Sequence, residues 1–259
     1  HVYSLWIGAA GMRAGSLAVD VVGHNLANVN TPGFRAGRPS FREEVSQRLL
    51  RPALPGVDGP PQVGTGVNVV AVLPDPRQGA LQTTGDPYHL AIEGSGFFRL
   101  RAPDGRIVYT RDGTFTTDAE GRLVHADGSL LLDDDNDPIE LPRWAETFTV
   151  DPDGTVTVEG DGRRRVIATI GLAMFPNPSG LEALGNNLFA ATPASGAEDV
   201  VEPGDDGAGV LRQGAYEMSN VDVAAEMVAM ILAQRTFQLS ARVVQTTDDM
   251  MALANQLVR

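Results

Sequence analysis

The sequence contains no cysteine, so disulfide bridges and thiolate metal ligands are excluded and the redox compartment is left open. It contains no lysine either, because all twenty basic residues are arginine, a bias that we interpret as genomic rather than functional. Histidine is scarce as well, and the four histidines have neither metal-ligand spacing nor cysteine partners. We therefore expect no catalytic residues, no cofactor and no metal.

Long apolar runs are also missing. No unbroken run approaches the ~18–20 residues of a membrane span, so we expect no membrane insertion. The N-terminus lacks a basic stretch followed by an apolar one, and we expect no ordinary signal peptide. The net charge of −13 is concentrated in residues 52–216, where acids outnumber arginines by 14. This acidic middle would repel phosphate, which argues against nucleic-acid binding.

What the chain has in quantity is glycine, 29 residues, and proline, 17 residues, in a sequence that is 42% hydrophobic. Such a composition predicts many turns and short strands around a buried core. Residues 51–175 follow this pattern, and residues 147–150 and 155–158 read as a tight hairpin around Pro152-Asp153-Gly154. Residues 165–175 read as one longer strand. No alternation of strands and helices suggests a Rossmann or barrel enzyme.

The chain ends are helical instead. Apolar and small residues recur in steps of three and four over residues 2–28, which is the seam pattern of a coiled coil. Gly8, Gly11, Gly15 and Gly23 interrupt this span, and each costs about 1 kcal/mol relative to alanine. Such a helix should form only when packed, and its small residues should let neighbouring helices approach closely.

Residues 220–259 predict a second long helix without glycine or proline. One apolar stripe contains Met227, Met230, Phe237 and Val244, and a second runs beside it from Val228 to Leu257. An apolar face this wide needs more than one partner. The predicted fold class is therefore mainly β, with an antiparallel β body and long N- and C-terminal α-helices that pack as a coiled-coil core.

Two motifs suggest chemistry but fail on inspection. The acidic run at 133–137 (DDDND) begins like a calcium loop, yet proline stands where that loop needs glycine and Trp144 where it needs glutamate. Gly94-Ser95-Gly96 lacks the flanking glycines of a nucleophile elbow. An acidic surface turn and a tight loop explain these residues.

The remaining motifs carry a family resemblance. Residues 23–35 (GHNLANVNTPGFR) closely resemble the N-terminal signature of the flagellar rod and hook family, and residues 219–237 resemble its C-terminal signature. His24 departs from the asparagine that is usual in the family. Shorter segments support the resemblance in the right order: 91–98 (AIEGSGFF), 109–113 (YTRDG), 180–189 (GLEALGNNLF) and 209–214 (GVLRQG).

Within the family, residues 62–67 and 246–250, together with the chain length, resemble the distal-rod branch. The proximal-rod and hook branches remain alternatives. From other classes, a β-domain hydrolase or carbohydrate-binding module would need clustered carboxylates or exposed aromatic residues, which make up only 6% here. A phage tail protein or a secreted adhesin is a further alternative.

The resemblance implies a structural subunit of the basal body, exported unfolded through the flagellar type III apparatus and located outside the cytoplasmic membrane. It implies a helical homopolymer, with other rod and hook subunits as partners, and surrounding ring proteins where an outer membrane exists. The residues expected in the assembly interface are Leu5, Met12, Val19, Asn25, Leu26, Asn28, Asn30, Pro32, Gly33, Phe34, Asn220, Met227, Met230, Gln234, Phe237, Val244 and Met251.

The domain boundaries follow from the same pattern. We expect an inner-tube helix and exit turn over residues 1–35, connecting loop and strands over 36–80, the β body over 81–215, and an inner-tube helix over 216–259.

Hydrogen exchange tests this organisation. Because glycine weakens the first helix and the second needs several partners, residues 1–35 and much of 220–259 should open at near-zero free energy in a dilute monomer. Residues 90–175 should stay protected, because a β core does not depend on other chains. Strong protection at both chain ends would contradict folding coupled to polymerisation.

Overall fold

The computed structural model describes residues 2–43, 47–48, 62–63 and 67–257, and the chain divides into two compact units. The helical unit comprises residues 1–27, 37–73 and 222–259. The β unit comprises residues 28–36 and 74–221. Each unit is therefore assembled from segments that lie far apart in the sequence.

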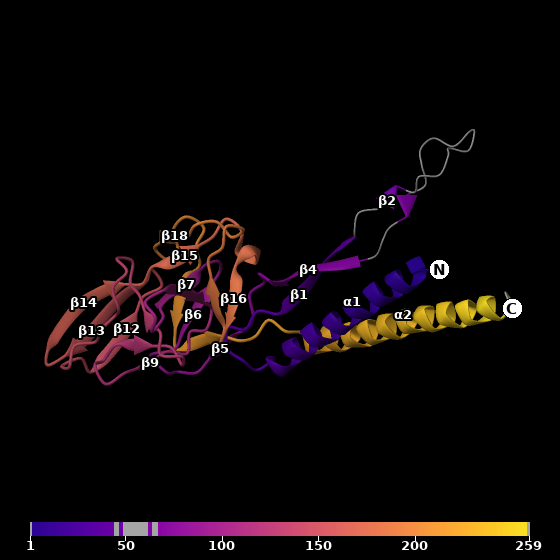
Figure 1. The fold of residues 1–259 in the computed structure, drawn as a ribbon. Coiled ribbons are helices and arrows are strands. Elements are labelled where there is room, and N and C mark those ends of the chain that lie inside the picture. Colours follow the sequence, from indigo (N-terminus) through magenta and orange to yellow (C-terminus); the bar gives the residue numbers. More distant parts are fainter. Residues whose placement is uncertain (1, 44–46, 49–61, 64–66, 258–259) are drawn as a thin grey trace. The chain divides into compact units, whose positions relative to one another are not determined.

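In the helical unit, α1 (Val2–Ala27) and α2 (Val223–Leu257) lie side by side and run antiparallel (Figure 1). At a rise of 1.5 Å per residue, the 35 residues of α2 span about 52 Å. Strand β1 (Gly37–Glu43) pairs with β4 (Val67–Pro74), and β2 (Gln47–Arg48) pairs with β3 (Gln62–Val63).

The β unit is built from antiparallel sheets. The largest follows the order β16-β17-β8-β7-β11-β10-β9, and β15 joins it at β7 and carries β18. Its strands are β7 (Phe97–Arg101), β8 (Ile107–Thr110), β9 (Thr116–Thr117), β10 (Leu123–Val124), β11 (Leu130–Leu131), β15 (Leu172–Met174), β16 (Glu182–Gly185), β17 (Leu188–Ala190) and β18 (Asp199–Val201).

Smaller sheets complete this unit. One has the order β12 (Thr147–Val150), β13 (Thr155–Gly160) and β14 (Arg163–Thr169). The strand β6 (Leu90–Glu93) pairs with β19 (Val210–Gln213), and β5 (Leu81–Thr83) pairs with β20 (Ala215–Glu217). A single 3₁₀ turn, η1, spans Pro178–Gly180.

The core lies between these sheets. Leu90, Phe98, Phe115 and Leu123 are completely buried, and the Phe98 and Phe115 rings meet edge to face with centroids 5.3 Å apart. Burying one such aromatic side chain is worth about 1.5–3 kcal/mol. The β unit thus has a core of its own, to which strand residues and residues between strands, such as Phe115, both contribute.

The structure confirms the predicted fold class, a β body with long terminal helices packed on each other. It also confirms the hairpin, since β12 pairs with β13 from Thr147 opposite Glu159 to Val150 opposite Val156. The single strand predicted over residues 165–175 is wrong. The strand is interrupted at residues 170–171, and β14 and β15 join different sheets; a Cβ on Gly171 would lie 2.9 Å from the Asp134 Cα.

Helix α1 bears on the expected absence of a membrane span. Ser4–Ala27 is long enough to cross a membrane, and its mean hydropathy of 1.3 is high enough. These two measures are the only support for a membrane span. No unbroken apolar run exists there, but the glycines and alanines between the large residues keep the average high. One such helix is weak support for a span, because core helices and signal sequences meet the same test. The absence of membrane insertion stays a prediction.

His125 lies between two carboxylates in the β unit. Its Nε2 lies 3.0 Å from the Asp112 carboxylate and its Nδ1 lies 2.7 Å from that of Asp127. Burial disfavours the charged imidazole, but the bonds to both carboxylates outweigh burial and raise the pKa of His125. The pKa of each carboxyl is lowered, because hydrogen bonds from His125 and from Thr114 or Ser129 outweigh burial. His125 therefore bridges two loops through both of its ring nitrogens.

This arrangement predicts a pH dependence of stability. A raised histidine pKa stabilises the fold fully below the unfolded value near 6.5, and the contribution is lost as the pH rises through the folded pKa. The free energy of unfolding lost in His125→Gln should therefore be larger at pH 5.5 than at pH 8.5, by roughly 1–3 kcal/mol. Urea unfolding followed by Trp144 fluorescence measures it, and an equal loss at both pH values would contradict a charged His125.

Candidate assembly interface

Glycines of α1 make the closest approach to α2. A Cβ on Gly8 would lie 2.5 Å from the Val244 Cγ2, and one on Gly15 would lie 3.1 Å from the backbone nitrogen of Phe237. A Cβ on Gly11 would also clash, with the side chain of Ser240. Only glycine permits this separation, so the residues that weaken α1 as an isolated helix create its contact with α2.

A polar cluster closes the other end of this helix pair. The Glu226 carboxylate is fully buried and accepts hydrogen bonds from Asn25, at 3.0 Å, and from Arg38, at 2.6 Å. The same asparagine side chain accepts the backbone N–H of Gly37 and donates to its carbonyl. Asn25 therefore connects α1, α2 and the start of β1 through one amide, a role internal to the chain.

Asp222 begins α2. Its Oδ1 accepts the backbone N–H groups of Ala224 and Ala225 at 3.0 and 3.2 Å, which is the geometry of a helix N-cap. Asn220 has a different role in the β unit. Its side chain accepts the N–H of Ala36 at 2.7 Å and donates to the carbonyl of Arg77 at 2.8 Å.

The turn that follows α1 is docked on the β unit. Gly33 has φ of 66° and lies against the backbone of Asp112, where a Cβ would be 2.3 Å from a nitrogen atom. The Pro32 carbonyl accepts a bond from the Asn187 side chain, and Phe34 is buried. Gly33 is thus required both for the left-handed backbone and for the space.

A buried ion-pair network lies beneath this turn. The Glu217 carboxylate is 3.0 Å from the Arg35 guanidinium and 2.5 Å from that of Arg111. Arg111 also donates to the carbonyl oxygens of Ile92, Gly94 and Gly96. Burial, together with the neighbouring Arg35, lowers the pKa of Arg111 to about 10 in spite of Glu217. Arg111 therefore remains charged at neutral pH.

α2 leaves much of its apolar surface uncovered. Only Glu226, Ala233 and Thr247 are buried among its described side chains. An exposed stripe, 44–62% accessible, recurs in steps of three, four and seven: Val228, Leu232, Leu239, Val243, Met250 and Leu253. We call it the outer stripe. A shorter apolar patch on the other flank contains Val223, Met227 and Ile231, in steps of four.

The residues predicted for the interface occupy three different settings. Half-buried in the helices, beside the glycine contact, are Leu5, Met12, Val19, Leu26, Met230, Val244 and Met251. Exposed on α2 are Met227, Gln234 and Phe237. The others, Asn25, Asn28, Asn30, Pro32, Gly33, Phe34 and Asn220, lie at the α1–β1 cluster or in and around the docked turn. Their part in assembly stays a prediction.

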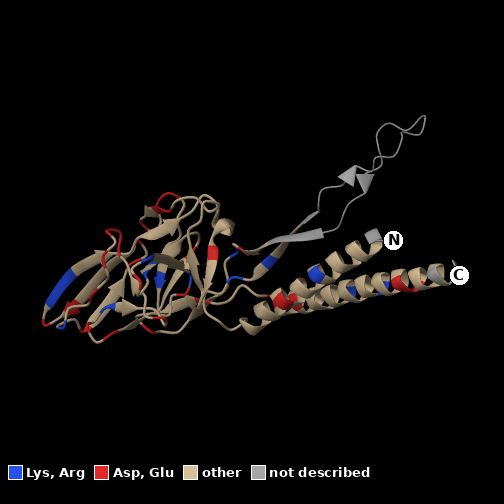
Figure 2. Ribbon diagram, viewed as in Figure 1, with Lys and Arg blue, Asp and Glu red and all other residues tan. Residues whose placement is uncertain are grey.

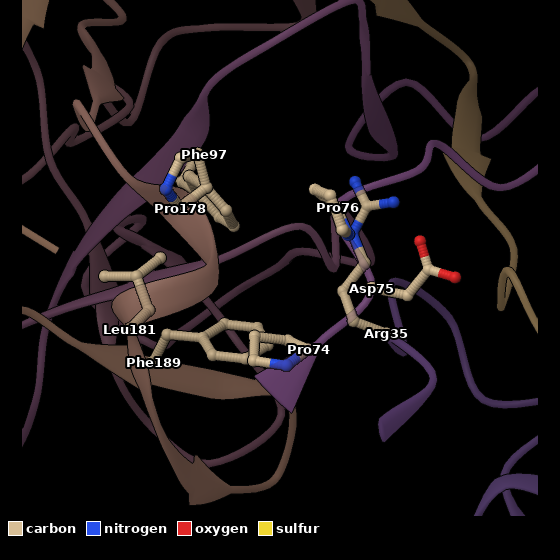
Figure 3. Close-up of a pocket in the computed structure, with 8 residues that line it drawn as sticks. All are labelled: Arg35, Pro74, Asp75, Pro76, Phe97, Pro178, Leu181 and Phe189. Atoms are coloured by element: carbon tan, nitrogen blue, oxygen red, sulfur yellow. The ribbon is translucent and has the colours of Figure 1, made fainter. Parts of the chain in front are cut away.

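The structure offers little for small-molecule chemistry. A cavity of about 10 Å³ in the β unit, lined by prolines, Phe97, Leu181, Phe189, Arg35 and Asp75, has room for one water (Figure 3). Within the described residues, no three histidine, aspartate or glutamate side chains are placed to hold a metal. In the acidic run, the Asp133 Oδ1 accepts the N–H groups of Asp135 and Asp137, as in a polar surface turn.

Comparison with known proteins identifies the helical ends and the β unit together. Residues 5–35 match the model "Flagella basal body rod protein", residues 91–158 the "Flagellar hook protein FlgE/F/G D1 domain", and residues 212–257 the "Flagellar basal body rod FlgEFG protein C-terminal". Flagellar basal-body rod protein FlgG of Borreliella burgdorferi is 39% identical, covering 99% of this chain and 98% of that protein. FlgG of Bacillus subtilis is 37% identical, covering 96% of each.

The chain belongs to the flagellar basal-body rod family. It is a structural protein of the flagellar basal body and not an enzyme. Membership of the rod family also implies assembly with other rod or hook subunits. The resemblance drawn from the sequence motifs is therefore confirmed over nearly the whole chain.

Sequence reasoning missed two features of this site. The outer stripe was recognised as a reason to expect more than one partner for α2. The residues expected in the assembly interface, however, were chosen mainly from the stripe that contains Met230, Phe237 and Val244. The buried Glu217 network was not foreseen at all. A signal existed for Glu217, since it follows the buried Ala215 by two residues and so faces the same side of β20.

The glycine contact yields a matched pair of substitutions. Gly15→Leu should drive α1 away from α2, at a cost of about 1–3 kcal/mol. Gly23→Leu should instead raise helix content, because a Cβ there meets nothing within 4 Å and leucine favours helix over glycine by up to about 0.8 kcal/mol.

Circular dichroism of the dilute chain measures both changes. The helices are expected to open at near-zero free energy. A substitution that changes the free energy of opening by about 1.4 kcal/mol therefore alters the population of helical chains severalfold. Equal effects at the two positions would show that the glycines are not a packing surface.

Proposed function

We propose that this chain is a distal-rod subunit that polymerises helically into a hollow driveshaft, and that its helical unit supplies the inner tube. The observation that carries the proposal is the outer stripe of α2. Exposed apolar side chains in a continuous row are costly in a monomer, and such surfaces mark protein–protein contacts. A neighbouring copy that covers the row would remove this cost.

The arrangement of apolar surface supports neighbours on more than one side. The outer stripe and the Val223–Ile231 patch lie on opposite flanks of α2, on either side of the face that packs on α1. A subunit with two such flanks can contact one copy on each, which is what a repeating, non-closing contact requires. Dry packing between helices would then transmit torque along the rod.

A polar row on α2 supports the hollow form of the polymer. Beyond Ile231, the sector that carries the short patch continues with exposed polar side chains: Gln234, Gln238, Arg242, Gln245 and Asp249. Both acidic and basic groups occur in the row, so its net charge is small. In a tube whose walls are these helices, the row would remain wetted and face the channel.

The distal position is supported by the comparisons. Relatives named basal-body rod protein FlgG are 34–39% identical over nearly their whole length, while the hook-basal body complex protein FlhP of Bacillus subtilis is 28% identical. We infer further that the chain passes unfolded through the flagellar type III export apparatus, for which a glycine-weakened α1 is suited. Ring proteins around the rod would be partners where an outer membrane exists.

Leu239→Asp tests the polymerisation surface. Leu239 is 62% exposed in the single chain, so the substitution should change the stability of the subunit by less than about 0.5 kcal/mol. In the polymer the same carboxylate would be buried without a partner, and incorporation into the rod should fail. Swimming of complemented cells, together with circular dichroism of the purified variant, measures the two effects.

Gln238→Asp is the matched control, because it adds the same charge one residue away on the polar row. It should leave swimming intact. Normal swimming of Leu239→Asp cells, or equal loss in both variants, would contradict the assignment of the outer stripe.

A further inference from the structure

The edge strand β14 carries an unusual run of positive charge. It is the outer strand of the β12-β13-β14 sheet, and it begins with three exposed arginines, Arg163, Arg164 and Arg165, followed by Val166, which is 58% exposed. Figure 2 shows this run as the blue stretch of β14. We call these three residues the arginine edge.

The charges of the arginine edge are only partly neutralised. Arg164 lies 3.3 Å from the Glu159 carboxylate in an exposed pair, which is worth little. In the part of the chain that the structure describes, neither Arg163 nor Arg165 has a carboxylate within 4 Å. An open hollow of about 430 Å³ is lined by Arg163 and Arg164 together with Glu146, Glu159 and Asp161. Two of the three guanidinium groups are thus presented beside a recess rather than on a flat face.

Acidic residues gather at the opposite end of the same strand. The Thr169 carbonyl, the last of β14, accepts the N–H of Asp134 at 2.9 Å, and a Cβ on Gly171 would touch both Asp134 and Val200. The acidic turn therefore meets the segment that contains β18. Five carboxylates of these two segments form what we call the acidic patch: Asp134, Asp135, Asp137, Glu198 and Asp199.

Basic groups near the acidic patch do not cancel it. Arg99 is 1% exposed, where it pairs with Glu198, and the Arg101 guanidinium donates to the carbonyl of Asn136. Burial raises the pKa of Asp133, and the neighbouring carboxylates of Asp134 and Asp137 add to this shift. The acidic patch is consequently a surface that a cationic partner would stabilise.

The arginine edge and the acidic patch of one chain are too far apart to form ion pairs with each other. Six residue steps of β14 separate Arg163 from Thr169, which is about 20 Å of extended strand. This exceeds the Debye length of about 8 Å at physiological ionic strength. Each end therefore remains available to another molecule.

We propose that the arginine edge of one copy docks on the acidic patch of the next, giving a head-to-tail contact between β units in the polymer. The inference rests on the proposed function, since it assumes that copies of this chain repeat along one assembly. Opposite charge at the two ends of one strand makes a heterologous contact that can repeat without closing. Arginine forks pair with carboxylates in two-point hydrogen bonds, which also fixes orientation.

A second copy fits these ends better than another anion does. The chain carries a net charge of −13, so a polyanion would be repelled by most of the surface. A neighbouring copy brings its carboxylates already arranged on two packed segments. The same contact also covers the exposed Val166 and the free edge of β14.

Disulfide trapping tests the contact directly, because the chain has no cysteine of its own. In the full-length variant Arg163→Cys/Asp135→Cys, mild oxidation of assembled subunits should give a ladder of dimers, trimers and longer oligomers. The two sites within one chain are too far apart to join, since a disulfide needs Cα atoms within about 7 Å. Each single-cysteine variant should give no ladder.

Charge reversal provides a second, independent test. Arg163→Glu/Arg165→Glu and Asp134→Arg/Asp135→Arg should each raise the concentration needed for polymerisation by about tenfold or more, because like charges then meet. Mixing the two variants should restore polymerisation, since every contact again joins opposite charges. The matched control, Arg106→Glu/Arg212→Glu, reverses two exposed arginines elsewhere and should polymerise normally.

The outcomes separate this inference from the proposed function. If the wild-type chain forms no polymer, the proposed function fails first. If the wild type polymerises but the double-cysteine variant gives no ladder, or mixing gives no rescue, only the head-to-tail contact is overturned. It is also overturned if the Arg163→Glu/Arg165→Glu variant gains sheet-rich aggregates as an isolated subunit, since the arginines would then serve to keep a bare strand edge from pairing.

Discussion

Within the β unit, the buried carboxylate of Glu217 is the group that joins the turn after α1 to the strands around it. It binds the guanidinium groups of Arg35 and Arg111, and it accepts the N–H of Gly79 at 2.9 Å. Its own backbone carbonyl accepts the N–H of Gly33 at 2.7 Å. Removing one partner from a buried pair costs about 3–5 kcal/mol, because the other charge is left in a dry site. The turn after α1 and the strand before α2 are therefore held together by these ion pairs, independently of the hydrogen bonds within the sheets.

The helical unit repeats this solution on a smaller scale. Glu226 is fully buried between Asn25 and Arg38, so each unit contains one glutamate that holds segments distant in sequence. The N-terminal signature of the rod family supplies three of these six partners, Asn25, Gly33 and Arg35. Several polar residues of the signatures thus act inside the chain, and the surface that the helical unit leaves for other subunits is largely apolar. A mutation in a signature asparagine would disturb the subunit itself before it disturbed assembly.

Sequence reasoning succeeded where one period dominated a long segment. The three-and-four spacing identified α1 and α2, and the hairpin turn at 152–154 fixed the register of β12 and β13. It failed where tertiary contacts overrule a local pattern: residues 165–175 are uniformly strand-like, yet the strand is interrupted at residues 170–171, where Gly171 packs so closely on Asp134 and Val200 that a Cβ would lie 2.9 Å from an atom of each. The glycines of α1 were rightly expected to permit close approach. Periodicity alone, however, predicted that the contact with α2 would follow the row of larger apolar residues next to these glycines. Which stripe of α2 faces α1 depends on those glycines, and so could not be read from α2.

These features together support the proposal that the subunit is exported unfolded and becomes rigid once assembled. Three glycines give α1 a close contact with α2 while removing about 3 kcal/mol of helix propensity, so the helical unit is stabilised mainly by what packs on it. The outer stripe then offers apolar area that only another molecule can cover, and covering it adds stability that the single chain lacks. The β unit, with a complete core and buried ion pairs, needs no such help. Stability is therefore divided along the chain: the part that meets neighbours through apolar helices gains order on assembly, and the part that carries charge on its surface is ordered before it.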